Sequence, residues 1–128
     1  MGVSDVRDRG APHRPRDAVI FRAEPVHLEE AWGIVSEYYE AVGVQLREDF
    51  RAFADEYFGA GSGVWLAKTG GAVVGCIALR PLPEIPGAAE VKRLYVQPSS
   101  RGEGIAERLL RTLEAFANEA GYEWLYLD

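Results

Sequence analysis

One long amphipathic segment between two strand-like segments most constrains how this chain can fold. From Glu103 to Glu119 apolar residues recur every three or four positions, which is typical of a helix with one buried face. The segments on either side, Ala88–Val96 and the stretch from Tyr122 onward, carry the valines, leucines and aromatic residues that strands favour. A strand, a helix and a strand in this order form a right-handed crossover with parallel strands. The pattern therefore predicts an α/β fold.

The other expected elements come before this crossover. They are a strand at Ala18–Pro25, helices at Val26–Ala41 and Arg47–Phe58, and a hairpin of strands Val64–Lys68 and Ala72–Arg80 around Thr69-Gly70-Gly71. The resulting order is β-α-α-β-β-β-α-β, with strands two to four as antiparallel neighbours and helices on both faces of the sheet. Residues 1–17 are polar and contain several Pro and Gly, so we expect a flexible tail followed by one domain over 18–128.

Composition and charge argue against several classes of protein. The formal net charge is −6, whereas nucleic-acid binding needs a basic surface, so we expect no nucleic-acid partner. The single cysteine, Cys76, permits no internal disulfide and no Cys-based zinc site, and we expect no metal. No apolar run approaches the roughly 20 residues that span a bilayer, and the first residues lack the apolar centre of a signal peptide. We therefore expect a cytoplasmic protein with no membrane partner.

Two glycines, Gly102 and Gly104, open the long helix, although glycine in a helical turn costs about 1 kcal/mol relative to alanine. Glycines before a helix N-terminus let a phosphate approach the free backbone N–H groups, which would offset this cost. The alternative is that both glycines only shape a tight turn. The P-loop motif is absent because Ile105-Ala106 follows Gly104, and the dinucleotide motif is absent because residue 107 is Glu.

The segment Arg101-Gly102-Glu103-Gly104-Ile105-Ala106 resembles the Q/R-x-x-G-x-G/A signature of the GCN5-related N-acetyltransferases, the GNAT superfamily. The resemblance implies a mixed, mostly antiparallel sheet flanked by helices. It implies acetyl-CoA as co-substrate, with its pyrophosphate on the backbone amides of the signature loop. It also implies that the pantetheine arm pairs with a bulged fourth strand. The implied cofactor-binding residues are Leu94, Tyr95, Val96, Arg101, Gly102, Glu103, Gly104, Ile105 and Ala106.

Acetyl transfer to an amine needs a base that removes a proton from the amine. Glu90 is our candidate, since a regular strand would place it on the same face as Val96. A bulge would change that, and a solvated carboxylate paired with Lys92 or Arg93 is the alternative. Glu84, in the preceding loop, is a weaker candidate. The resemblance points to the backbone N–H of Val96 as the oxyanion donor.

The resemblance also implies a tyrosine general acid in a helix that follows the fifth strand. The sequence ends at Asp128, so we expect that helix and the last two strands of the family to be missing. Either the chain is a fragment, or a partner supplies the missing strands. The fifth strand would then have an unpaired edge, and because such edges invite pairing, a homodimer stays open.

Three hypotheses follow. The first is an acetyl-CoA-dependent N-acetyltransferase that acts on a primary amine of an unidentified acceptor. The second is a non-catalytic acyl-CoA-binding module or inactive fragment, and the third is a structural domain whose glycine loop is only a turn. Acidic residues in the first two helices would attract a cationic amine if they border the acceptor site, but they also fit a solvated helix face. These residues are Glu37, Glu40, Glu48, Asp49, Asp55 and Glu56.

Overall fold

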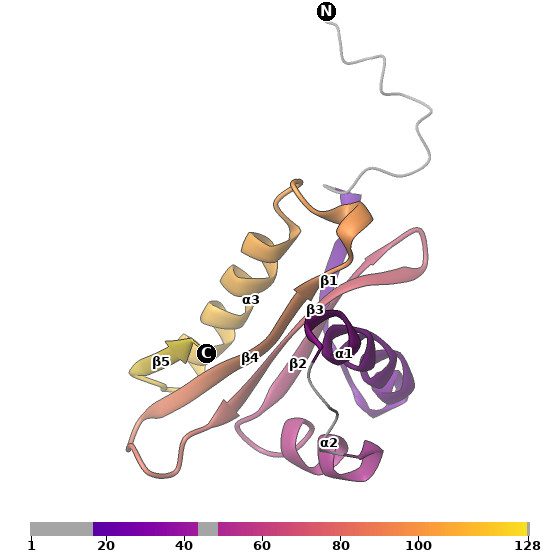
Figure 1. Ribbon diagram of the computed structural model, residues 1–128. Coiled ribbons are helices and arrows are strands. Elements are labelled where there is room, and N and C mark those ends of the chain that lie inside the picture. The colour runs from indigo at the N-terminus through magenta and orange to yellow at the C-terminus, as the bar shows by residue number, and fades with distance from the viewer. Residues whose placement is uncertain (1–16, 44–48, 128) are drawn as a thin grey trace, which may run out of the picture.

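The computed structural model describes residues 17–43 and 49–127. It contains one five-stranded sheet with the strand order β1-β2-β3-β4-β5, flanked by helices (Figure 1). The strands are β1 (Val19–Arg22), β2 (Gly63–Thr69), β3 (Ala72–Pro81), β4 (Ala88–Val96) and β5 (Trp124–Leu127), and the α-helices are α1 (Leu28–Val42), α2 (Phe50–Tyr57) and α3 (Ile105–Glu119). The first four strands are antiparallel and β4 pairs with β5 in parallel. The expected α/β class, element order and crossover are therefore confirmed.

The element boundaries follow from local backbone chemistry. The first helix begins after a 3₁₀ turn at Pro25–His27 and ends at Gly43, whose φ of 72° is the left-handed conformation of a C-cap glycine. The second helix begins at Phe50 because the Asp49 side chain caps it, accepting a hydrogen bond from Ala52 N at 2.8 Å. Residues 47 and 48 of the expected second helix lie outside the described residues, as does the expected N-terminal tail apart from Asp17.

The third helix begins two residues later than the sequence pattern predicts. Gly102 and Gly104 have φ values of 83° and 86°, which are left-handed and incompatible with a right-handed helix. The expected start at Glu103 is therefore wrong, and the helix begins at Ile105. Both glycines belong to the loop, so they do not incur the cost of glycine inside a helix.

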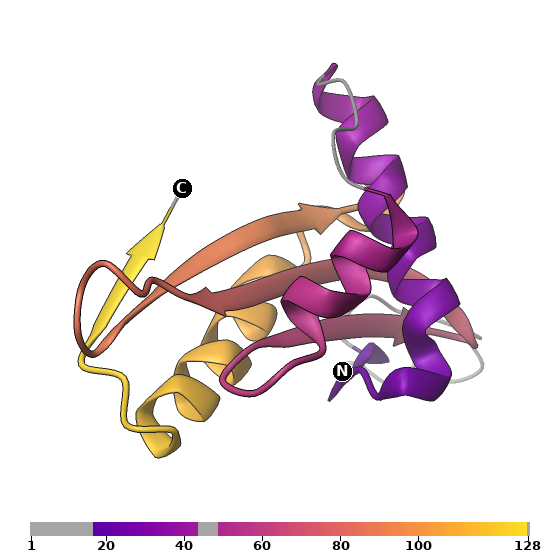
Figure 2. The same cartoon turned by 90° about the horizontal axis from the view of Figure 1, so that it is seen from below.

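The sheet lies between α3 on one side and α1 and α2 on the other (Figure 2), with an apolar core on each side. On one face, α3 contributes Ile105, Leu109 and Leu113, which pack against side chains of β2, β3 and β4. On the other face, α1 and α2 contribute Val35 and Phe53, among others, to a second cluster. Within the described residues, no helix combines the length and the apolar character needed to cross a membrane.

A β-bulge interrupts β4 where it pairs with β3. Cys76 lies opposite Tyr95 and Ala78 lies opposite Lys92, so Ile77 alone faces two residues of β4. The bulge changes which face each later residue presents. Val91 and Val96 both belong to the core under α3, although five residues separate them, while Tyr95 belongs to the core under α1 and α2.

Replacing Leu109 by alanine should lower the free energy of unfolding by about 2–5 kcal/mol, because its side chain is fully buried under the sheet. Leu110→Ala is the matched control on the same helix, since Leu110 is only partly buried, and it should cost less than half as much. Urea denaturation followed by circular dichroism measures both values. Equal losses in the two variants would contradict the packing of α3 described here.

Candidate functional site

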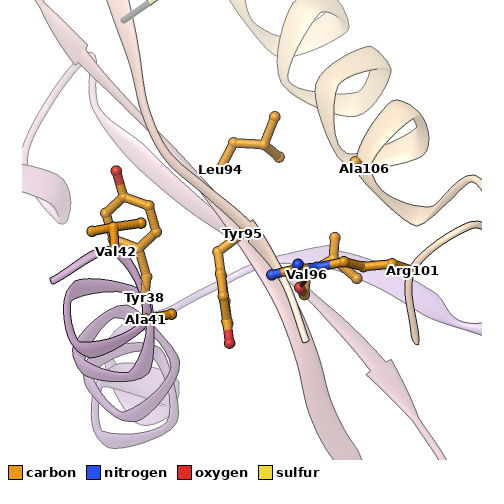
Figure 3. A pocket seen from close by; sticks show the side chains of 8 residues that line it. All are labelled: Tyr38, Ala41, Val42, Leu94, Tyr95, Val96, Arg101 and Ala106. Atoms are coloured by element: carbon orange, nitrogen blue, oxygen red, sulfur yellow. Dashed lines mark hydrogen bonds between the residues drawn. The ribbon is translucent and has the colours of Figure 1, made fainter. Parts of the chain in front are cut away.

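A cavity of about 430 Å³ lies between α1, the end of β4 and the start of α3 (Figure 3). Its lining residues are Tyr38, Ala41, Val42, Leu94, Tyr95, Val96, Arg101 and Ala106. Five residues that the sequence singled out therefore meet at one cavity: the last three of β4, together with Arg101 and Ala106. The side chain of Ile105 instead packs in the core at 1% exposure, and Gly102, Glu103 and Gly104 lie in the adjoining loop.

The first backbone N–H groups of α3, which follow the glycine loop, have no hydrogen-bond acceptor within the helix. The first hydrogen bond of the helix runs from Arg108 N to Gly104 O at 3.1 Å, so the amides of Ile105 and Ala106 have no acceptor within the helix. In the described part of the chain, no atom beyond the adjacent residues lies within 4 Å of the position that a Cβ would take on Gly102 or Gly104. The backbone conformation, and not crowding, therefore favours glycine at both positions. Because the helix dipole adds partial positive charge, this loop can bind an anion.

Arg101 contacts the last two residues of β4. Its Nε donates a hydrogen bond to the backbone oxygen of Val96 at 2.7 Å, and its guanidinium carbon lies 5.6 Å from the ring centroid of Tyr95. The side chain thus extends back to the end of β4 (Figure 3). It joins the loop before α3 to the strand that lines the cavity.

Glu37 of α1 accepts hydrogen bonds from the end of β4 and from the residue that follows it. The Tyr95 hydroxyl donates to Glu37 Oε2 at 2.8 Å, and Gln97 Nε2 donates to Glu37 Oε1 at 3.1 Å. Burial raises the pKa of Tyr95, and the hydrogen bond and the negative charge of Glu37 raise it further. The sequence placed Glu37 only among acidic residues near the acceptor side. It gave no sign of this contact, which joins residues 58 positions apart.

Glu90 lies on the opposite face of β4 from Val96. Its Oε1 accepts a hydrogen bond from Arg80 Nε at 3.0 Å and forms an ion pair with Arg80 Nη2 at 2.9 Å. Arg80 also faces Glu56 of α2 at 3.5 Å, which places Glu90 on the α2 side, whereas Val96 packs under α3. The shared face that a regular strand would give is lost because the bulge intervenes, and the Glu90 carboxylate pairs with Arg80.

A smaller cavity of about 120 Å³ adjoins the first one. It is lined by Tyr38, Val91, Lys92, Arg93, Leu94 and Leu127, so Tyr38 and Leu94 form walls of both cavities. The parallel pairing of β4 with β5 runs from Ala88 to Val91, and the small cavity opens beyond it. Glu90 lines neither cavity.

The described residues hold no group of three or more His, Cys, Asp or Glu side chains that could bind a metal ion. The site therefore offers backbone amides, hydroxyls and one arginine as its polar groups. Such groups suit an anionic, partly apolar ligand that extends from the loop before α3 to the end of β4.

Comparisons with known proteins find similar sequences. A family model described as "Acetyltransferase (GNAT) family" matches residues 28–128. An uncharacterized N-acetyltransferase of Schizosaccharomyces pombe is 31% identical over 110 residues, which cover 81% of this chain and 67% of the relative. N-acetyltransferase 8F1 of Rattus norvegicus is 35% identical over 92 residues, which cover 70% of this chain and 42% of the relative.

Solved structures share the fold. An acetyltransferase of the GNAT family from Staphylococcus aureus Mu50 has a TM-score of 0.73 at 20% identity, over 86% of this chain and 71% of that chain. The acetyltransferase AAC(6')-Iy, in complex with the bisubstrate analog CoA-S-monomethyl-acetylneamine, has a TM-score of 0.72 at 18% identity, over 87% and 78% of the two chains. The chain spans only 29% of N-acetyltransferase 8 of Mus musculus, with 46% identity over 65 residues.

The stabilising effect of Tyr95 should depend on pH. Because the folded state raises the pKa of Tyr95, its contribution is complete below the unfolded value of about 10 and is lost as the pH rises through the folded value. At pH 8, Tyr95→Phe should lower the free energy of unfolding by about 1.5–3 kcal/mol, as expected for a hydrogen bond to a charged group. Urea denaturation at pH 8 and pH 11 tests this, and a difference from the parent that does not shrink at pH 11 would contradict it.

Proposed function

Because the chain belongs to the acetyltransferase (GNAT) family, we propose that it transfers the acetyl group of acetyl-CoA to a primary amine. One observation carries the proposal. The last three residues of β4 and the start of α3 border the same cavity, and the first backbone N–H groups of α3 have no acceptor within the helix. This arrangement gives a long ligand an anion-binding end and an apolar wall.

The proposed binding mode assigns the pyrophosphate of acetyl-CoA to the backbone amides from Arg101 to Ala106. The left-handed φ values of Gly102 and Gly104 support this assignment, since they turn the loop without placing a side chain over it. The pantetheine arm would lie along Leu94, Tyr95 and Val96, whose side chains line the cavity.

The proposed chemistry uses two groups of β4. The Val96 N–H would donate to the oxygen of the tetrahedral intermediate, where a backbone donor stabilises the developing negative charge. Glu90 would accept the proton of the amine through a water, because its side chain lines neither cavity. Arg80 would hold the Glu90 carboxylate in place through its hydrogen bond and its ion pair.

A non-catalytic acyl-CoA-binding module is the second candidate function. The observation that favours it is the position of Glu90, which is bound to Arg80 away from the cavity. A carboxylate held in this way can stabilise the fold without taking part in catalysis.

For the acetyltransferase proposal, the first amine to screen is neamine, because AAC(6')-Iy shares the fold and was solved in complex with a bisubstrate analog that contains acetylneamine.

Acetyl-CoA binding should depend on Gly104. The parent chain should bind acetyl-CoA with a dissociation constant between about 1 μM and 1 mM, the usual range of Michaelis constants. Gly104→Glu should weaken binding at least about tenfold, because a carboxylate in an anion-binding loop repels phosphate. Isothermal titration calorimetry measures both affinities.

Gly71→Glu is the matched control, since Gly71 also has a φ of 86° and no atom within 4 Å of its Cβ position, but lies in the β2–β3 turn. Equal weakening in the two variants would show that backbone strain, and not the loop before α3, accounts for the effect. A folded parent chain that binds no acetyl-CoA would contradict the proposed function.

Glu90→Gln should separate catalysis from binding. If Glu90 is the base, CoA release in the presence of an amine should fall about 10²–10⁴-fold, while the affinity for acetyl-CoA stays at the parental value. Glu56→Gln is the control, because Glu56 contacts the same Arg80 from α2. A thiol assay follows the release, and a parental rate in Glu90→Gln would eliminate Glu90 as the base.

A further inference from the structure

The bulge in β4 places an arginine in a conformation that favours glycine. The φ of Arg93 is 60°, and among residues 17–43 and 49–127 it is the one positive value outside glycine. Bulges with a left-handed residue usually have glycine at that position. A residue in such a sparsely populated conformation persists only where its surroundings hold it there. The side chain of Arg93 should therefore supply an interaction that glycine lacks.

That interaction is a cage of two aromatic rings from different helices. The guanidinium carbon of Arg93 lies 4.9 Å from the ring centroid of Tyr39 in α1 and 5.7 Å from that of Tyr57 in α2. Tyr57 is 1% exposed, so water screens the contact little, and cation–π attraction is strongest where the partners are desolvated. The cage ties the bulge to both helices that cover this face of the sheet.

The backbone of the bulge is held from β3 as well. The buried thiol of Cys76 donates a hydrogen bond to the Arg93 oxygen at 3.1 Å. Burial raises the pKa of this thiol well above its usual range, so it keeps the proton that it donates. The carbonyl and the side chain of Arg93 thus both have contacts that hold the residue in its left-handed conformation.

We propose that Arg93 is a positioning residue: its aromatic cage locks the bulge of β4 and so fixes the backbone of residues 94–96 along the cavity. These three residues follow the bulge directly, and all three line the cavity. The face of the sheet on which each of their side chains lies depends on the extra residue of β4 opposite Ile77. A bulge free to move would change the orientation of the Val96 N–H and the shape of the wall that Leu94 forms.

The test compares two arginines that make the same kind of contact. Arg22 lies over Phe116 at 4.4 Å and over Trp65 at 5.8 Å, remote from the cavity. Amide hydrogen exchange by NMR is measured for Arg93→Met and Arg22→Met, with Arg93→Gly as a variant that accepts the φ without strain. Exchange at residues 94–96 should become at least about tenfold faster in both Arg93 variants, because these amides lose the lock on the bulge. It should stay unchanged in Arg22→Met.

Parental exchange at residues 94–96 in the folded Arg93→Gly variant would overturn the proposal. So would an equal acceleration in Arg22→Met, since the effect would then follow from general destabilisation. Arg93→Gly should also weaken acetyl-CoA binding at least about fivefold, a step that rests on the proposed function, and unchanged affinity would overturn the link to the cavity. A parent chain that binds no acetyl-CoA would count against the proposed function alone, and the exchange result would still decide for or against the cage.

Discussion

The register of β4 against β3 is the constraint on which the candidate site depends. Because Ile77 faces two residues of β4, Val96 packs under α3 and Tyr95 points toward α1. In a strand without the bulge the alternation of side chains would continue from Val91, and Val96 would lie on the other face. The end of β4 can therefore contribute to a cavity between α1 and α3 only because one extra residue shifts its register.

Three contacts from separate parts of the chain hold this strand end in place. The Arg93 cage joins the bulge to α1 and α2, the Glu37 carboxylate binds Tyr95 from α1, and Arg101 binds the Val96 oxygen from the loop before α3. Each of them orients backbone or wall atoms and leaves the cavity free for a ligand. In the proposed site, which would use backbone amides, such supporting contacts would determine how precisely a bound group is oriented.

The sequence predicted the elements well where a pattern recurs over many residues. The bounds of β4 were predicted correctly at Ala88–Val96, with a glycine just before the strand and a proline shortly after it. The family resemblance implied a bulge in this strand, but its position was not predictable from the residues, because the left-handed residue is Arg93 and arginine carries no signal for that conformation. The sequence also did not identify Arg80 as the partner of Glu90. The two residues lie opposite each other on the neighbouring strands β3 and β4, and only the register of these strands reveals this pairing. Contacts such as that of Glu37 with Tyr95 depend on how a helix packs, which local sequence does not specify.

Chemical-shift mapping of the chain with acetyl-CoA tests the central claim most directly. Backbone amide spectra recorded during a titration report which residues the ligand contacts, whether or not an acceptor amine is known. The account predicts the largest changes at the amides of residues 94–96 and 102–106, with small changes in β1 and α2. Changes confined to other elements, or none in a folded chain at millimolar acetyl-CoA, would contradict the assignment of this cavity as the acetyl-CoA site.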